Sequence, residues 1–165
     1  MAGVTDAAPA PGGLPGAVLF CCNLNRVRSP IAEGLMKLWF GQAVYADSCG
    51  LHAGTARDQL PPRADPFAVS VMDELGIDLS RHKPKNFDDL EDDSFDVVIS
   101  LTPEAHHRAG EIARGRAIDV EYWPTLDPTL VSGQRDVMLQ AYRDVRDSLE
   151  KRLRARFGAI RTFGG

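Results

Sequence analysis

The chain has 165 residues, of which 44% are hydrophobic and 25% are charged, and its formal net charge is −4. This length suits one domain with a substantial core, and the acidic balance gives no sign of a nucleic-acid partner. No apolar run approaches the roughly 20 residues that span a bilayer, so we expect no membrane partner.

Cysteine content and the terminal segments set the expected organisation. Three cysteines form neither a disulfide framework nor a metal-type spacing, so we expect a reducing, cytoplasmic setting without a metal or cofactor. Residues 1–16 are rich in Ala, Gly and Pro and have no basic start, which favours a disordered tail over a secretory signal. We expect one domain over residues 17–157 and a loose tail over residues 158–165.

A strand, a short loop and a helix start follow the N-terminal tail. The run from Ala17 to Cys21 is apolar and uncharged, which is typical of a strand covered on both faces. Ser29 suits the N-cap of a helix and Pro30 suits its first position. Apolar residues then recur at helical spacing up to Phe40, and Gly41 is expected to end the helix.

Strands and helices then alternate along the rest of the chain. Further strands are expected at 43–48, 95–101 and 117–123. Further helices are expected at 65–76, 104–113 and 135–157, with Asp65 and Thr102 as N-caps. The connections are expected at 49–54, 55–62, 77–84, 87–93 and 124–134, with a short helical turn within 87–93.

This alternation predicts an α/β three-layer sandwich. Its four-stranded parallel sheet should have helices on both faces, right-handed crossovers and the flavodoxin-like order 2-1-3-4. A ligand is then expected outside the carboxyl ends of the strands, where the loop after the first strand lies.

That loop carries the chemistry of the chain, with Cys22 and Arg28 six positions apart. A loop between a strand end and a helix N-terminus turns its backbone N–H groups inward and forms an anion site. The planar fork of Arg28 would grip two oxyanion oxygens, and Cys22 would lie at the floor as a nucleophilic thiolate. The pattern indicates attack on a tetrahedral oxyanion such as a phosphate ester.

Cys22 to Ser29, followed by Pro-Ile-Ala-Glu, resembles the active-site loop of the low-molecular-weight protein tyrosine phosphatases. It equally resembles that of their relatives, the thioredoxin-coupled arsenate reductases. The strand before the loop and Asp127-Pro128 late in the chain strengthen the resemblance, which covers roughly Val18 to Leu153. The family usually has Gly where this chain has Leu24.

The resemblance assigns roles to the loop residues. Arg28 would bind the oxyanion, Asn25 would shape the loop through side-chain hydrogen bonds in a left-handed conformation, and Ser29 would donate to the Cys22 thiolate. Arg26 is either an ordinary surface charge or a residue that steers substrate. The phosphate is expected to lie against Asn23, Leu24, Asn25, Arg26, Val27 and Ser29.

Asp127 is the predicted general acid, which would protonate the leaving oxygen and later activate water. A turn aspartate is the alternative, since Asp-Pro is a common turn signal, and Asp119 and Asp136 are weaker candidates for the acid. Phosphatases of the family usually carry aromatic residues after Asp-Pro, whereas this chain has Thr129 and Leu130. Trp123 is either a wall for a substrate ring or a core residue.

Three functions follow from these residues. We expect a phosphomonoester hydrolase that acts on a phosphorylated protein or a small phosphate through a cysteinyl-phosphate. The alternative is an arsenate reductase that uses the same Cys22 with an external thiol or with Cys49. Cys21 would point to the other face of its strand. A module that binds a phosphorylated partner without turnover is the third interpretation.

Histidines and acidic residues elsewhere indicate no further site. His52, His82, His106 and His107 show no metal-ligand spacing, and the last two are expected on a solvated helix face. The acidic run from Asp88 to Asp93 has no calcium-loop pattern.

Overall fold

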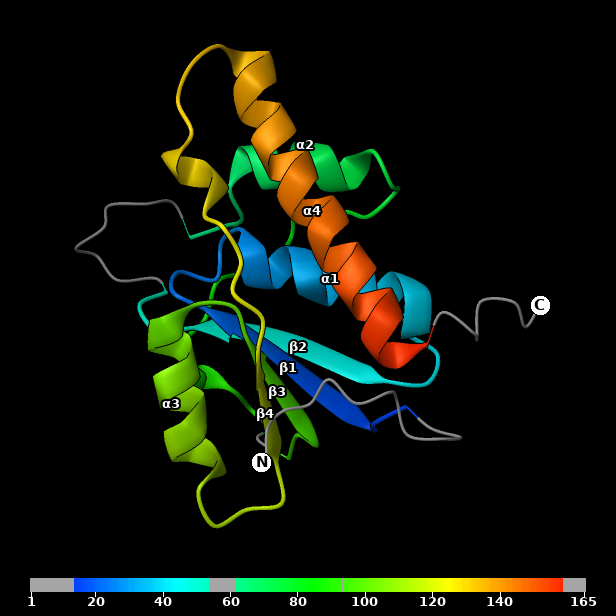
Figure 1. Ribbon diagram of the computed structural model, residues 1–165, viewed down its shortest axis with the longest axis vertical. Coiled ribbons are helices and arrows are strands. Elements are labelled where there is room, and N and C mark those ends of the chain that lie inside the picture. Colours follow the sequence, from blue (N-terminus) through cyan, green and yellow to red (C-terminus); the bar gives the residue numbers. More distant parts are fainter. Residues whose placement is uncertain (1–13, 54–61, 93, 159–165) are drawn as a thin grey trace.

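The protein is described by a computed structural model that covers residues 14–53, 62–92 and 94–158. Four parallel strands form one sheet in the order β2-β1-β3-β4 (Figure 1). The strands are β1 (Ala17–Cys22), β2 (Tyr45–Gly50), β3 (Val97–Ser100) and β4 (Asp119–Tyr122). The predicted α/β fold, the parallel sheet and the strand order 2-1-3-4 are therefore confirmed.

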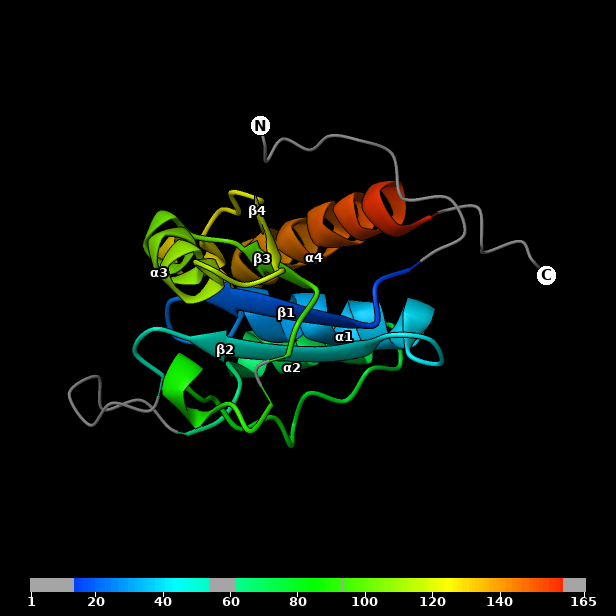
Figure 2. The same cartoon turned by 90° about the horizontal axis from the view of Figure 1, so that it is seen from below.

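Helices cover both faces of the sheet, as Figures 1 and 2 show. One face carries three helices: α1 (Arg28–Phe40), α2 (Pro66–Asp73) and α4 (Arg135–Phe157). The other face carries α3 (Pro103–Ala113) and the short 3₁₀ helix η2 (Phe87–Asp89). A second 3₁₀ helix, η3 (Pro128–Leu130), lies in the connection between β4 and α4. No helix among the described residues combines the length and apolar character that crossing a bilayer requires.

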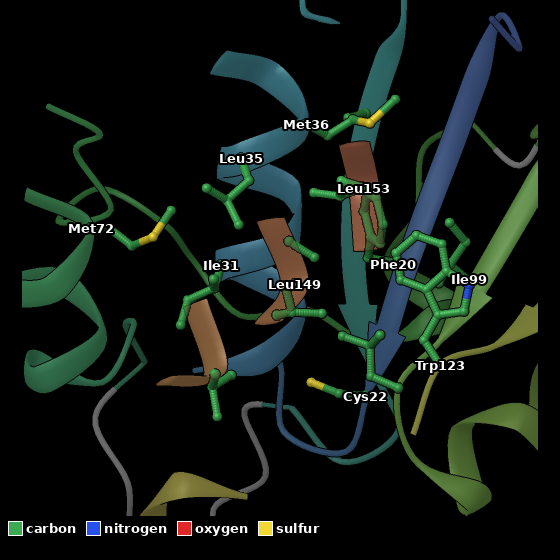
Figure 3. Packing of buried hydrophobic residues seen from close by; sticks show 14 of the residues in the cluster. Phe20, Cys22, Ile31, Leu35, Met36, Met72, Ile99, Trp123, Leu149 and Leu153 are labelled. Carbon is green, nitrogen blue, oxygen red and sulfur yellow. The ribbon is translucent and has the colours of Figure 1, made fainter. Parts of the chain in front are cut away.

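The larger core lies between the sheet and the three helices of its first face (Figure 3). Phe20 and Ile99 project from the sheet against Leu149 and Leu153 of α4, and all four are fully buried. Burying each such side chain stabilises the fold by about 1.5–3 kcal/mol. Cys22 lies on this same face at the end of β1, so the core fixes the strand end from which the loop between β1 and α1 starts.

Several predicted boundaries shift. The second strand begins at Tyr45 and not at residue 43, because Ala43 and Val44 still hydrogen-bond to the carbonyl of Phe40. It ends at Gly50, so Cys49 and Gly50 lie in a strand where a loop was expected. The third and fourth strands keep their centres but are shorter than expected at both ends.

The helix starts at Asp65 and Thr102 are confirmed, because each side chain accepts a backbone N–H of the first turn. The helix that follows Asp65 ends at Asp73, three residues before the expected Gly76. The chain turns there, and Gly76 takes a φ of 77° that suits glycine.

The expected tails fall mostly outside the described residues, as do residues 55–61 of the expected rim segment. Within the described part, Leu14 packs against the core and the Gly16 N–H donates to Asp96. Residues 14–16, the described part of the tail expected over 1–16, therefore belong to the structured chain. At the other end, Gly158 closes α4 in a left-handed conformation.

Candidate active site

The loop between β1 and α1 begins at Cys22, whose side chain is 2% exposed. The backbone N–H groups of residues 23–27 donate no hydrogen bond to any described residue. Five consecutive N–H groups without a partner among the described residues, between a buried thiol and the start of a helix, can bind an anion; we call them the anion cradle.

The end of β2 holds this loop from one side. Leu51 and His52 donate their N–H groups to the carbonyl of Asn23, at 2.9 Å and 2.8 Å. A Cβ at Gly50 would lie 2.7 Å from the same carbonyl oxygen, so only glycine lets the two backbones approach this closely. The loop's shape thus depends on the edge strand as well as on its own sequence.

Asn25 is the centre of the hydrogen bonds that shape the loop. It is fully buried with a φ of 57°, the single non-glycine residue with a positive φ among those described. Its amide donates to Ser29 Oγ at 2.8 Å and to Ser48 Oγ at 3.0 Å. Its Oδ1 accepts from the Lys85 N–H, and His82 Nε2 lies 2.9 Å from its carbonyl oxygen. The predicted left-handed, loop-shaping geometry of Asn25 is therefore present.

Ser29 does not cap the helix, contrary to expectation. Helix α1 begins at Arg28, where Ile31 already donates to the carbonyl of Val27, and no side chain caps it. The hydroxyl of Ser29 is instead buried 2.9 Å from Cys22 Sγ and accepts the amide of Asn25. Its position one residue inside the helix turns it toward the thiol, where it can stabilise negative charge on sulfur.

A second layer of polar contacts lies behind the loop. Ser48 donates to Glu33 at 2.6 Å, and Lys85 forms an ion pair with Asp47 at 2.6 Å. Burial lowers the pKa of His82, which favours the neutral ring beside Asn25.

Arg28 joins the loop to the segment after β4. Its Nη1 donates to the carbonyl of Thr125 at 3.0 Å, and its Nη2 lies 3.7 Å from Asp127 Oδ2. Asp127 in turn accepts the N–H and the hydroxyl of Thr129 through Oδ1, which leaves Oδ2 facing Arg28. The structure thus brings Cys22, Arg28 and Asp127 together at the carboxyl end of the sheet, whereas Asp119 and Asp136 are not tied to the loop.

The remaining loop residues differ in what their side chains do. Asn23 accepts the hydroxyl of Thr102 at 2.7 Å, and Val27 packs into the core. Leu24 has no positive φ, so the leucine that replaces the family's usual glycine is not strained. Arg26 donates from Nε to the carbonyl of Arg63 at 2.9 Å.

The model of the family "Low molecular weight phosphotyrosine protein phosphatase" matches residues 17–162. The chain belongs to this family. It is 31% identical over 136 residues to the glutaredoxin arsenate reductase of Synechocystis, an alignment that covers 82% of this chain and 92% of that protein.

Solved structures agree with this assignment. An arsenate reductase in a phosphate-binding state is 30% identical with a TM-score of 0.67, covering 84% of this chain and 93% of that one. A low-molecular-weight tyrosine phosphatase of T. tengcongensis is 25% identical with a TM-score of 0.65, covering 82% and 93%. Both enzyme classes of the family are therefore similar to this chain.

The other two cysteines lie across the sheet from Cys22. Cys21 and Cys49 are in-register partners on β1 and β2, and both pack in the core of the opposite face. Burial raises the pKa of both thiols, which favours their protonated form. All three cysteines are free. Cys49 thus lies on the other face of the sheet from Cys22, which speaks against the alternative in which Cys49 reacts with Cys22 during arsenate reduction.

The structure decides between the two roles that the sequence leaves open for Trp123, and it shows which side chains lie around Asp127-Pro128. Trp123 is a core residue, 4% exposed, with its ring against Phe20 and Phe157, so it provides no pocket wall. Leu126 precedes Asp127-Pro128, and Thr129 and Leu130 follow it; the two leucines are 85% and 81% exposed.

The prediction of a solvated face for both adjacent histidines is wrong for His106. Its ring stacks on Tyr122 at 4.8 Å and its Nδ1 lies 2.8 Å from Ser100 Oγ, while His107 is exposed. The sequence also does not predict the contact of Thr102 with Asn23. The N-cap role of Thr102 already explains a threonine at this position, so nothing in the sequence indicates a second role. No group of three metal-ligating side chains occurs among the described residues.

Proposed function

We propose that the chain is a phosphomonoester hydrolase that works through a cysteinyl-phosphate. The observation that carries this proposal is the buried thiol of Cys22 beneath five unpaired N–H groups, with Arg28 and Asp127 at the same mouth. Phosphoryl transfer depends on positioning and on stabilising charge that spreads over the equatorial oxygens. The cradle and the Arg28 guanidinium supply those donors.

In the first step the Cys22 thiolate attacks phosphorus, the S–P bond forms, and the ester P–O bond breaks. Asp127 gives its proton to the leaving oxygen. In the second step Asp127 takes a proton from water, whose oxygen attacks phosphorus, and Cys22 leaves as a thiolate. Ser29 stabilises that thiolate in both steps through the 2.9 Å contact.

The substrate is a phosphorylated protein or a small phosphate ester. A catalytic thiol needs a reducing compartment, so we place the enzyme in the cytoplasm. The aliphatic rim at Leu126 and Leu130 replaces the aromatic wall that stacks on a phenyl ring in related phosphatases, so phosphotyrosine has no dedicated platform here.

Arsenate reduction is the second candidate, favoured by the arsenate reductases among the similar proteins. Cys22 would attack arsenate and expel water. An external thiol would then attack the sulfur of Cys22, so that arsenite leaves with two electrons and a mixed disulfide forms. A second external thiol would restore Cys22. The sheet between Cys22 and the other two cysteines is the reason why the thiols must come from outside.

One experiment separates the candidates. Wild type, Cys22→Ser and Cys21→Ala are assayed for hydrolysis of 4-nitrophenyl phosphate, and for arsenate reduction with glutathione and glutaredoxin or with thioredoxin. We expect hydrolysis in wild type and in Cys21→Ala, the matched thiol control on the other face, and none in Cys22→Ser. Arsenite formation without ester hydrolysis would replace the first proposal by the second. Binding of phosphate without either reaction would leave a binding module.

A further inference from the structure

Arg26 occupies the middle of the anion cradle and is tied to the segment that precedes α2. Its carbonyl accepts the N–H of Asp65 at 3.0 Å, and its Nε donates to the carbonyl of Arg63 at 2.9 Å. The first bond fixes the backbone of Arg26 and the second fixes its side chain against Arg63. Neither terminal Nη nitrogen has a hydrogen bond or ion pair with any described residue.

The carboxylates of Asp65 and Asp127 have partners other than Arg26. Asp65 accepts the N–H of Phe67 through Oδ1 and the hydroxyl of Tyr142 through Oδ2, at 3.0 Å for the hydroxyl. Asp127 faces Arg28 and Thr129. The guanidinium of Arg26 is therefore a half-buried cation that forms no ion pair with a described carboxylate.

Arg26 and Asp127 both act electrostatically on Tyr142, a buried residue of α4. Burial and the carboxylates of Asp65 and Asp127 raise the pKa of this phenol, whereas the guanidinium of Arg26 lowers it. One buried ring thus lies within electrostatic reach of both residues. Residues 63–65 contact the loop through Arg26, and the segment of Asp127 contacts it through Arg28.

A second cation adds to the first. The side chain of Arg63 is exposed and forms no ion pair with a described residue. Arg26 and Arg63, joined by the hydrogen bond between them, thus form a cationic rim without an ion pair to any described residue, in a chain of net charge −4. A cationic rim of this kind attracts an anionic group that enters beside the scissile phosphate.

We propose that Arg26 selects substrates that carry a second negative charge next to the scissile phosphate, such as an acidic residue beside a phosphorylated side chain. This inference rests on the proposed hydrolase function. Arg28 holds the phosphate itself, and the free Nη groups of Arg26 pair with the neighbouring carboxylate. Arg26 is a specificity-determining residue and takes no part in bond breaking.

The test uses two pairs of aryl phosphates, 3- and 4-carboxyphenyl phosphate and their carboxamide analogues. Each carboxamide matches its carboxylate in size and lacks the charge. The quantity measured is the ratio of kcat/KM for carboxylate over carboxamide, in wild type, Arg26→Gln, Arg26→Lys and Lys151→Gln. Comparing this ratio between variants removes the difference in leaving-group basicity.

Lys151→Gln is the matched charge control. It removes one positive charge from an exposed position of α4, nine residues beyond Tyr142 and so about 14 Å further along the helix. We expect Arg26→Gln to lower the ratio about three- to tenfold, the size of a partly exposed ion pair with charged hydrogen bonds. Arg26→Lys should retain part of the preference, and Lys151→Gln should leave the ratio unchanged.

A ratio that is equal in wild type and Arg26→Gln overturns the inference, since a purely structural role would lower kcat/KM for both esters alike. If wild type hydrolyses none of the esters, the proposed function fails separately. The matching pairs of carboxy- and carbamoyl-benzylphosphonate are then titrated into the wild type and Arg26→Gln by calorimetry. Tighter binding of the carboxylate that depends on Arg26 supports the inference, and equal Kd values refute it.

Discussion

Removing the hydroxyl of Ser29 should slow the second chemical step far more than the first. The hydroxyl lies 2.9 Å from Cys22 Sγ, in a fully buried position where water cannot replace it. A hydrogen bond to a charged partner contributes about 1.5–3 kcal/mol. Because Cys22 leaves as a thiolate when the cysteinyl-phosphate is hydrolysed, Ser29→Ala should lower kcat about 10- to 150-fold.

The assay is a stopped-flow measurement of 4-nitrophenol release from 4-nitrophenyl phosphate. The first step consumes the thiolate, so losing its donor costs that step less. Ser29→Ala should therefore give a burst close to one equivalent of 4-nitrophenol, followed by slow turnover. The rate of the slow phase reports the hydrolysis of the intermediate.

Ser100→Ala is the matched control, because Ser100 is an equally buried serine whose hydroxyl contacts His106 and the carbonyl of Glu121. It should lose stability and keep its turnover. The reasoning is refuted if kcat of Ser29→Ala stays within threefold of wild type, or if Ser100→Ala loses as much activity as Ser29→Ala.

Three further predictions concern the acid, the thiols and the acid stability of the fold. Asp127→Asn should lower kcat/KM about 10²–10⁴-fold for alkyl phosphates and much less for 4-nitrophenyl phosphate, whose leaving group needs no proton; equal losses on both would exclude Asp127 as the acid. Treatment with hydrogen peroxide should produce no Cys22–Cys49 disulfide in peptide mass spectra, and finding that bridge would contradict the separation by the sheet. Hydrogen bonds from Arg143 and Arg146 lower the pKa of Glu74 to about 2, so its contribution to stability is present above pH 4.5 and disappears as the pH falls toward 2. Glu74→Gln should reduce the fall of the free energy of unfolding between pH 5 and 2, measured by urea unfolding. An unchanged dependence on pH would show that the pairs of Glu74 with Arg143 and Arg146 contribute nothing.

The sequence predicts the class of fold and the loop well because both depend on local patterns. Uncharged β-branched runs such as Val97–Ser100 identify buried strands, and Asn25 suits a left-handed position that few residues tolerate. Asp65 and Thr102 start their helices as N-caps because this role depends only on neighbouring N–H groups.

Features that depend on contacts between distant segments cannot be predicted from local sequence patterns. Serine is a typical N-cap residue, so the sequence predicts that role for Ser29. In the structure Ser29 lies inside the helix and contacts the Cys22 thiol, a contact that no local pattern shows. Arg28 meets the carbonyl of Thr125 97 residues later in the chain. The face of the sheet on which Cys49 lies follows from the register with Cys21, and register has no local signature.

The contact between Gly50 and the carbonyl of Asn23 has a consequence for protein engineering. The Cys-x5-Arg segment does not determine its own backbone conformation, because Gly50, Leu51 and His52, some 25 residues later in the chain, contact the carbonyl of Asn23. Grafting the eight residues from Cys22 to Ser29 onto another strand-loop-helix unit would transfer the reactive groups without the contacts that hold the loop in shape. A transplant that binds phosphate must therefore carry the end of β2 with it.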